Sequence, residues 1–118
     1  MILPSLYALI VGIAMIGQWS LSLVKRKVPE LKTEPYRIAF HLAGEFVTAV
    51  ALIAGGLGLL IAAPWGRPTF LVSMGMLLYT VIVSPGYFAQ KREWPMVVMF
   101  AVLFALALIS LIGVFRAT

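Results

Sequence analysis

The sequence predicts an all-α integral membrane protein in which four transmembrane helices form one bundle. Hydrophobic residues make up 63% of the 118 residues and charged residues only 11%, so polar side chains are too few to coat a water-soluble surface. Four nearly uncharged stretches are each long enough to cross a hydrocarbon core about 30 Å thick, which needs about 20 residues of helix. Because no Gly/Ser-rich linker divides the chain, we expect a single domain over residues 1–118.

The four predicted spans cover residues 2–24, 36–63, 68–90 and 94–116. No positive segment precedes the first span, and its apolar run is too long for a cleaved signal peptide, so we expect it to stay in the membrane. Helix is expected throughout because lipid offers an open backbone no hydrogen-bond partners. Pro68 and Pro95 suit the first turns of the third and fourth spans, where no helical hydrogen bond is lost.

Positive charges concentrate in two of the three connecting segments. Seven of the nine Lys and Arg residues lie there, namely Lys25, Arg26, Lys27, Lys32 and Arg37 after span one and Lys91 and Arg92 after span three. Arg67 and Arg116 lie on the opposite side. Because Lys and Arg near span ends favour the cytoplasm, we expect both termini on the non-cytoplasmic side.

Residues 25–29 and 91–95 share the pattern Lys-Arg-x-x-Pro at the same place in two successive hairpins. The bundle is therefore either two duplicated helical hairpins or a single-copy bundle, because selection for positive loops produces such segments independently.

Span two carries the ionisable residues that lie inside the predicted hydrocarbon. Arg37, His41 and Glu45 recur every four residues, so a helix places them along one face. Arg37 can extend to the headgroups, but Glu45 lies roughly 10 Å deep at about 1.5 Å per residue. A charged carboxylate in hydrocarbon costs several kcal/mol. We therefore expect Glu45 to face protein or trapped water and to pair with a cation or bind a proton.

Other spans supply polar residues at matching depths, counted inward from the cytoplasmic helix ends. The candidate ligand-binding or proton-relay residues are Glu45, His41, Arg37, Gln18, Tyr79, Ser84 and Tyr87. They predict a polar cavity walled by spans one to three, with span four as an outer or subunit-contact helix. The alternative is that these side chains only cross-link the helices.

Glycines cluster in the outer half of span two and in span one. Gly55, Gly56 and Gly58, together with Gly12 and Gly17, predict close packing between helices, and a flexible outer gate is the alternative.

Several classes of function are not expected. The absence of cysteine excludes disulfides and thiolate sites. His41 and Glu45 on one helix are too few ligands for a metal or haem, so we expect no metal and no cofactor. The net charge of +5 lies in short clusters between apolar segments, which does not predict nucleic-acid binding. Phosphate-loop, nucleophile-elbow and dinucleotide motifs are missing, and enzymatic activity is not the leading expectation.

The leading hypothesis is a small transporter or channel-like protein that uses Glu45 as a protonatable gate or substrate ligand, with His41 and Arg37 as relays. A chain of this length leaves little room for a path through one bundle, so the hypothesis includes a homo-oligomer in the lipid bilayer and an ion or small molecule as ligand. One alternative is an accessory or assembly subunit that docks through the polar stripe. The other is an enzyme that acts on a lipid or isoprenoid with His41 and Glu45 as acid and base.

The size and the four-span layout resemble the small multidrug-resistance transporters, in which an antiparallel dimer exchanges protons for substrate at a membrane-embedded glutamate. In that family the glutamate belongs to span one, whereas Glu45 lies in span two, and the charge bias here argues against insertion in both orientations. The resemblance is therefore architectural. His41 and Glu45 also resemble the acid–base pair of membrane sterol isomerases, over these two residues alone.

Overall fold

The computed structural model describes residues 2–25 and 30–116. Helix makes up 91% of the structure, and no strand occurs among the described residues. The helices are α1 (Ile2–Val24), α2 (Glu30–Thr33), α3 (Pro35–Leu60), α4 (Gly66–Gln90) and α5 (Trp94–Arg116). All except the short α2 are long and apolar enough to cross a membrane. The protein is thus a multi-pass, all-α membrane protein, as the sequence predicts.

Helices α3 and α4 end in the same backbone motif. After α3, Ala62 takes a positive φ of 56°, and the amide of Ala63 donates to the carbonyl of Gly58 at 2.9 Å. Arg92 does the same after α4, with φ 58°. These are Schellman ends, which satisfy the last helical carbonyls. Helix α3 therefore ends at Leu60, before the predicted limit of 63, because Ala62 leaves the helical conformation.

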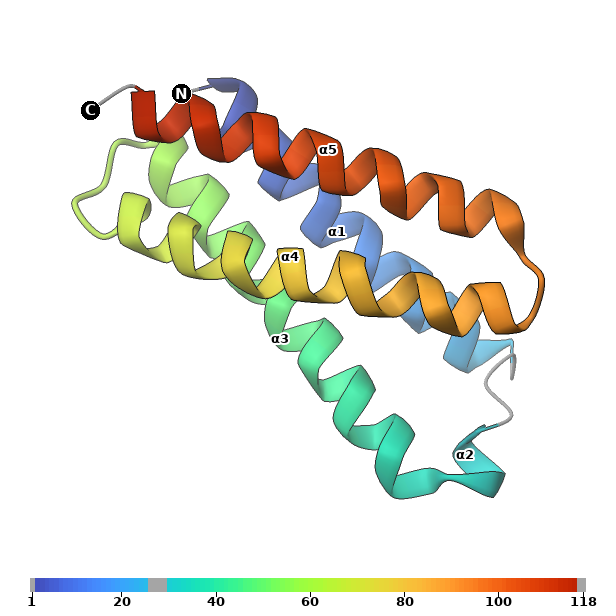
Figure 1. Ribbon diagram of the computed structural model, residues 1–118. Coiled ribbons are helices and arrows are strands. Elements are labelled where there is room, and N and C mark those ends of the chain that lie inside the picture. Colours follow the sequence, from blue (N-terminus) through green and yellow to red (C-terminus); the bar gives the residue numbers. More distant parts are fainter. Residues whose placement is uncertain (1, 26–29, 117–118) are drawn as a thin grey trace.

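The helices form a ring in which α3 packs against α1 and α4, and α5 packs against α4 and to a smaller extent α1. Figure 1 shows both termini at one end of the molecule, together with the turn between α3 and α4. Helix α2 and the turn between α4 and α5 lie at the opposite end, which we call the α2 end. The segment that contains Arg26 and Lys27, and with it most of the predicted repeat at 25–29, lies outside the described residues.

Close glycine contacts hold α3 against its neighbours from the middle of the bundle to the terminal end. A Cβ on Gly55 would lie 2.6 Å from Cα of Phe70 in α4, and one on Gly12 would lie 2.7 Å from the carbonyl oxygen of Ala49. A Cβ on Gly58 would lie 2.6 Å from Cα of Gly66. Such distances leave room for hydrogen alone, so the helices touch backbone to backbone.

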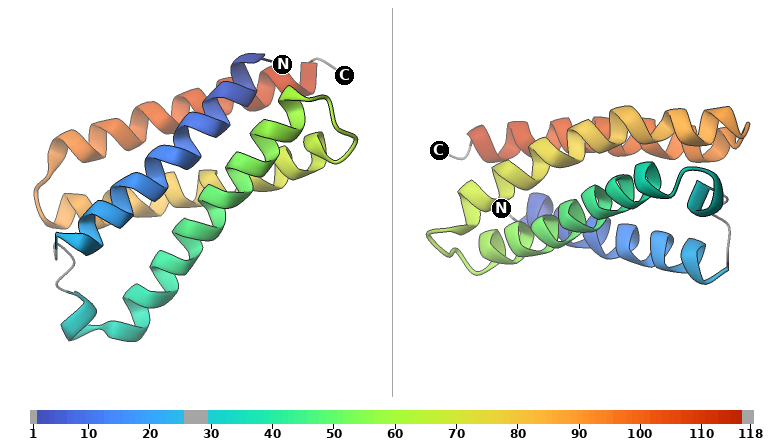
Figure 2. Two further views of the ribbon diagram at one scale, coloured as in Figure 1. Left: turned by 180° about the vertical axis from the view of Figure 1, so that it is seen from behind. Right: turned by 90° about the horizontal axis from the view of Figure 1, so that it is seen from below.

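Toward the α2 end the same helices spread apart. A Cβ on Gly44 would meet nothing within 4 Å, and neither would one on Gly17, so the close packing expected at Gly17 is wrong. Figure 2 shows α3 diverging from α1 and α4 on the way to α2. The bundle is tight at the terminal end and open between α3 and α4 at the other.

The core lies between α1, α3 and α4, around the fully buried Leu52, Phe70, Met74 and Leu77. Helix α5 buries one narrow stripe, Phe100, Ala107 and Val114. It is tied to α1 by the Tyr7 hydroxyl, which donates to the carbonyl of Leu103 at 2.6 Å. Helix α5 is therefore the outermost helix, in the position that the apolar span four predicts.

Candidate functional site

Two cavities lie between α3 and α4, and they share His41 and Val83. The first, about 450 Å³ in volume, opens at the α2 end. The second, about 460 Å³, follows it toward the middle of the bundle and reaches Thr48 and Tyr79. We call the two together the α3–α4 groove. Each cavity falls within the range of about 300–1,000 Å³ that is common for small-molecule sites.

The polar centre of the groove is the carboxylate of Glu45. Its side chain is buried, and Oε1 accepts a hydrogen bond of 2.8 Å from the hydroxyl of Ser84 in α4. The same oxygen lies 3.6 Å from Nε2 of His41, one helical turn away on α3. The structure thus brings together three residues that the sequence singled out, from two different helices.

His41 lies in the wall shared by the two cavities, and 27% of its side chain is exposed. Its Nε2 is buried and, within the part of the chain that the structure describes, has no hydrogen-bond partner. An imidazole nitrogen can accept or donate a proton. A movement of about half an ångström would bring this nitrogen within hydrogen-bond distance of Glu45, so the pair is placed to share one proton.

Trp19 of α1 closes the back of the site, which the sequence did not predict. Its ring is buried and meets His41 edge-on at a centroid distance of 5.6 Å. The sequence had favoured its neighbour Gln18, but successive residues on a helix point about 100° apart. A tryptophan within a membrane span was the available signal, because the indole carries a polar N–H on a large apolar ring.

Helix α1 lies behind the two cavities but supplies no residue to the lining of either. Both cavities are lined by α3, α4 and the residues next to their ends. Gln18 is half-buried and lines neither of them. Helix α1 contributes Trp19, which lies behind the site and packs against Tyr87 as well as His41.

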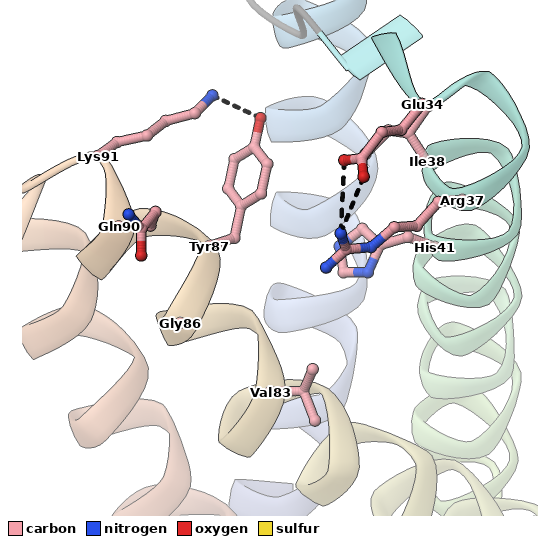
Figure 3. A pocket seen from close by; sticks show the side chains of 9 residues that line it. All are labelled: Glu34, Arg37, Ile38, His41, Val83, Gly86, Tyr87, Gln90 and Lys91. Atoms are coloured by element: carbon pink, nitrogen blue, oxygen red, sulfur yellow. Dashed lines mark hydrogen bonds and ion pairs between the residues drawn. The ribbon is translucent and has the colours of Figure 1, made fainter.

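The mouth of the groove carries charges on both walls (Figure 3). On the α3 side, Nη1 of Arg37 lies 3.2 Å from Oε1 and 3.4 Å from Oε2 of Glu34. On the α4 side, Nζ of Lys91 donates to the Tyr87 hydroxyl at 2.6 Å and lies 4.2 Å from the centre of that ring. Arg37 therefore belongs to the mouth and is directed at Glu34 rather than at Glu45.

Over the described ranges of the chain, neither Tyr79 nor Thr48 is hydrogen-bonded to the group formed by Glu45, Ser84 and His41. Tyr79 lines the deeper cavity from its outer edge and is 70% exposed, on the side that faces lipid in a membrane. The hydroxyl of Thr48 donates to the carbonyl of Gly44 at 2.7 Å, so its donor is used within α3. Among the described residues, no three His, Asp or Glu side chains are grouped so that they can hold a metal ion.

Comparison with known proteins finds a family model that matches the chain. A protein-family model described as a domain of unknown function (DUF8058) matches residues 3–118. No curated protein and no solved structure matches the chain. The family description states no activity, so a function has to be argued from the groove and its residues.

Proposed function

This chain belongs to the family described as a domain of unknown function (DUF8058), and we propose that it is a small carrier for an amphiphilic ligand. The ligand enters the α3–α4 groove, and its movement is linked to a proton held by Glu45 and His41. One observation supports the proposal most: the groove is open at the α2 end and closed at the other by the contacts of Gly55 and Gly58, with Glu45 between. A carrier that exposes its site to one side at a time has this shape.

The shape of the groove suits an amphiphile. Its mouth is lined by charged residues, whereas Phe40, Gly44, Met76 and Val83 supply apolar surface farther in. The rim is open sideways, since Phe40 is 79% exposed on one edge and Tyr79 on the other. A molecule with an apolar tail can therefore leave the bilayer and enter the groove without crossing water.

The proposal includes the orientation of the protein. The mouth lies at the α2 end, where Figure 1 also shows the last turns of α1 and α4. Lys25 follows α1, Lys32 belongs to α2, and Lys91 and Arg92 follow α4. Lys and Arg near span ends favour the cytoplasm. The mouth then faces the cytoplasm, both termini lie on the other side, and the described arrangement is the inward-facing one.

Glu45 is the proposed coupling residue because its charge has a high cost at this depth. Ser84 donates to the carboxylate and lowers the cost of the charged form. Proton uptake, by the carboxyl itself or by His41 beside it, removes or balances the remaining charge. A ligand that changes the charge or water content of the groove must then change the number of protons bound.

A homo-oligomer is part of the proposal. The groove has two helical walls, so a path across the whole membrane needs further protein surface. Helix α5 buries only three residues within the described chain and leaves an apolar face for a second copy. Chemical cross-linking in native membranes tests this point, and a species of one chain only would contradict it.

The experiment uses the protein in vesicles that contain a trapped pH-sensitive dye. Anionic, zwitterionic and cationic single-chain amphiphiles are added in turn, and the change in internal pH is followed. We expect at least one class to drive proton movement in the wild type, and Glu45→Gln to abolish it. Glu93→Gln is the matched control, because Glu93 is an exposed carboxylate that lines neither cavity. Equal proton movement in wild type and Glu45→Gln for every amphiphile would contradict the proposal.

One observation favours a second candidate, an enzyme acting on a lipid or isoprenoid. Nε2 of His41 is buried beside Glu45 at the wall of a cavity that can hold an apolar chain, as a general acid–base pair requires. Incubation with a membrane lipid extract separates the two functions. A new product that needs both His41 and Glu45 favours the enzyme, and proton movement without a product favours the carrier.

A further inference from the structure

We infer that the deeper cavity of the α3–α4 groove binds the ammonium group of a single-chain primary amine, and that it distinguishes a primary from a quaternary ammonium by the N–H donors. The chain of the amine lies against the apolar lining of the groove. The inference deepens the proposed carrier by naming its substrate class, and it rests on that function only for the exchange of amine and proton. Binding of the amine is measurable without transport.

An ammonium site needs a carboxylate that a ligand can reach, and Glu45 meets this requirement. Its side chain lines the deeper cavity although it is only 5% exposed. Oε1 accepts from Ser84, and the two oxygens of a carboxylate can accept further hydrogen bonds. Gly44 lines the same cavity, and a Cβ on it would meet nothing within 4 Å. A donating ligand group therefore has space beside the carboxylate.

The polar atoms around Glu45 are arranged to accept hydrogen bonds from a ligand. Ser84 gives its hydroxyl hydrogen to Glu45, and Thr48 gives its own to the carbonyl of Gly44. A hydroxyl has one hydrogen, so each of these oxygens can only accept while the two bonds last. Nε2 of His41 is buried and, in the described part of the chain, unpartnered. It accepts when the ring proton is on Nδ1. A primary ammonium, with three N–H donors, is the complementary group.

Charge and donors together separate a primary ammonium from other amphiphile heads. A cation that forms hydrogen bonds with a buried carboxylate offsets the cost of its charge in hydrocarbon. A hydroxyl head has one hydrogen and no charge, and a carboxylate head places a second negative charge beside Glu45. A trimethylammonium head has the charge but no N–H, so it cannot satisfy Nε2 of His41. A primary ammonium meets both requirements.

The chain of the amine has a place in the same cavity. Met76 and Val83 supply apolar surface there. Phe40 and Tyr79, at 79% and 70% exposure, are the two rings of the open rim, and a cation is attracted to the faces of such rings. An amine whose chain stays partly in the bilayer can therefore reach Glu45 from the side, without passing the charged mouth.

Binding of the ammonium displaces the proton that Glu45 and His41 share. The carboxylate and the neutral imidazole are the forms that accept from the ligand, so the proton leaves to water while every N–H bond of the ammonium stays intact. One positive charge enters the site and one leaves it. Helix α1 faces the pair with Trp19, which does not titrate. The other titratable residues that line the two cavities are Glu34 and Arg37 on the α3 side and Tyr79, Tyr87 and Lys91 on the α4 side.

Native mass spectrometry of the detergent-purified protein near neutral pH tests the inference. Dodecylamine competes in one sample with dodecyltrimethylammonium, which has the same chain and charge without N–H donors. Dodecanol and dodecanoate are titrated separately. We expect a one-to-one complex with dodecylamine that is about tenfold tighter, or more, than each of the other three, because only this head makes charged hydrogen bonds to both acceptors. Equal binding of dodecyltrimethylammonium would show that the site recognises charge alone and would overturn the inference, as would tighter binding of dodecanol or dodecanoate.

Variants identify the residues that bind the head. Glu45→Gln should weaken dodecylamine binding about tenfold or more. His41→Phe keeps a ring against Trp19 and removes Nε2, so it should weaken dodecylamine binding but leave dodecyltrimethylammonium binding within about twofold. A purely structural effect would weaken both. Glu93→Gln is the matched control, since Glu93 is an exposed carboxylate that lines neither cavity. An equal loss in Glu93→Gln would overturn the assignment, and a loss in Glu34→Gln in place of Glu45→Gln would overturn it by moving the ammonium to the mouth.

The vesicle experiment separates failure of this inference from failure of the carrier. Selective binding of dodecylamine without any amphiphile-driven proton movement would support the ammonium site and contradict the carrier. Proton movement driven by an anionic or zwitterionic amphiphile, without selective binding of dodecylamine, would support the carrier and overturn the ammonium assignment.

Discussion

The hydroxyl of Ser84 donates to Oε1 of Glu45 across the boundary between α4 and α3, at 2.8 Å. Both residues are buried, at 1% and 4% exposure. This contact is a polar link between the two walls of the groove. It supplies a hydrogen-bond donor to the buried carboxylate. It fixes Oε1 beside Nε2 of His41, so the proton-sharing geometry depends on it.

Removal of that hydroxyl is the first prediction. Ser84→Ala should lower the free energy of unfolding by about 1–2 kcal/mol, since it leaves a buried carboxylate with one donor fewer. Reversible unfolding in mixed micelles measures the change. Ser110→Ala on α5 is the control and should stay within about 0.5 kcal/mol of the wild type. Equal stability of the two variants would contradict the role of the contact.

The glycines provide a second prediction, on the closed end of the groove. Gly55→Ala should destabilise the protein by about 1–3 kcal/mol, because its methyl group would meet the backbone of Phe70 and push α3 from α4. Gly44→Ala has open space and should be neutral or slightly stabilising, as alanine favours helix. Thermal unfolding of the two variants in detergent measures the difference. A similar melting temperature for both would show that α3 and α4 do not meet as described.

Trp19 gives the third prediction. Trp19→Phe keeps an aromatic ring against His41 but removes the polar indole N–H from the surroundings of Glu45. It should cost about 1 kcal/mol of stability or more and reduce amphiphile-driven proton movement. Gln18→Ala, next to it in the chain and outside both cavities, should leave proton movement unchanged. If Gln18→Ala reduced proton movement and Trp19→Phe did not, Gln18 would be the residue of α1 that acts on Glu45.

Trp19 and Gln18 show which features of the site the sequence predicts and which it does not. Hydropathy and length predict four spans because the bilayer sets the length of a helix that crosses it. The four-residue spacing predicts that His41 and Glu45 meet on one face. Depth can be counted along a helix in the same way, but the rotation of α1 about its axis depends on packing against its neighbours. That rotation selects Trp19 rather than Gln18.

Other features of the site depend on long-range packing as well. The sequence places Arg37 on the stripe with Glu45, whereas the structure turns it toward Glu34 at the mouth. The divergence of α3 and α4 follows from which glycines of α3 touch the neighbouring backbone, and Gly55 does so while Gly44 does not. Nothing local in the sequence distinguishes these two glycines.

Side-specific labelling gives the fourth prediction and tests the orientation. The chain contains no cysteine, so Val83→Cys provides a single thiol. Val83 is 45% exposed and lines both cavities, and its thiol should react with a membrane-impermeant maleimide added from the cytoplasmic side. Leu77→Cys, at a fully buried position, should stay unlabelled. Labelling of Val83→Cys from the opposite side alone would reverse the proposed topology.

We propose that ligand in the groove and a proton at Glu45 and His41 depend on each other. If ligand binding and proton binding are coupled, the ligand must change the pH at which the proton-carrying group titrates. The infrared band of the Glu45 carboxyl, identified by its loss in Glu45→Gln, measures that titration with and without each amphiphile of the panel. We predict a different midpoint pH in the presence of the amphiphile that drives proton movement. A titration curve that no amphiphile changes would contradict the account.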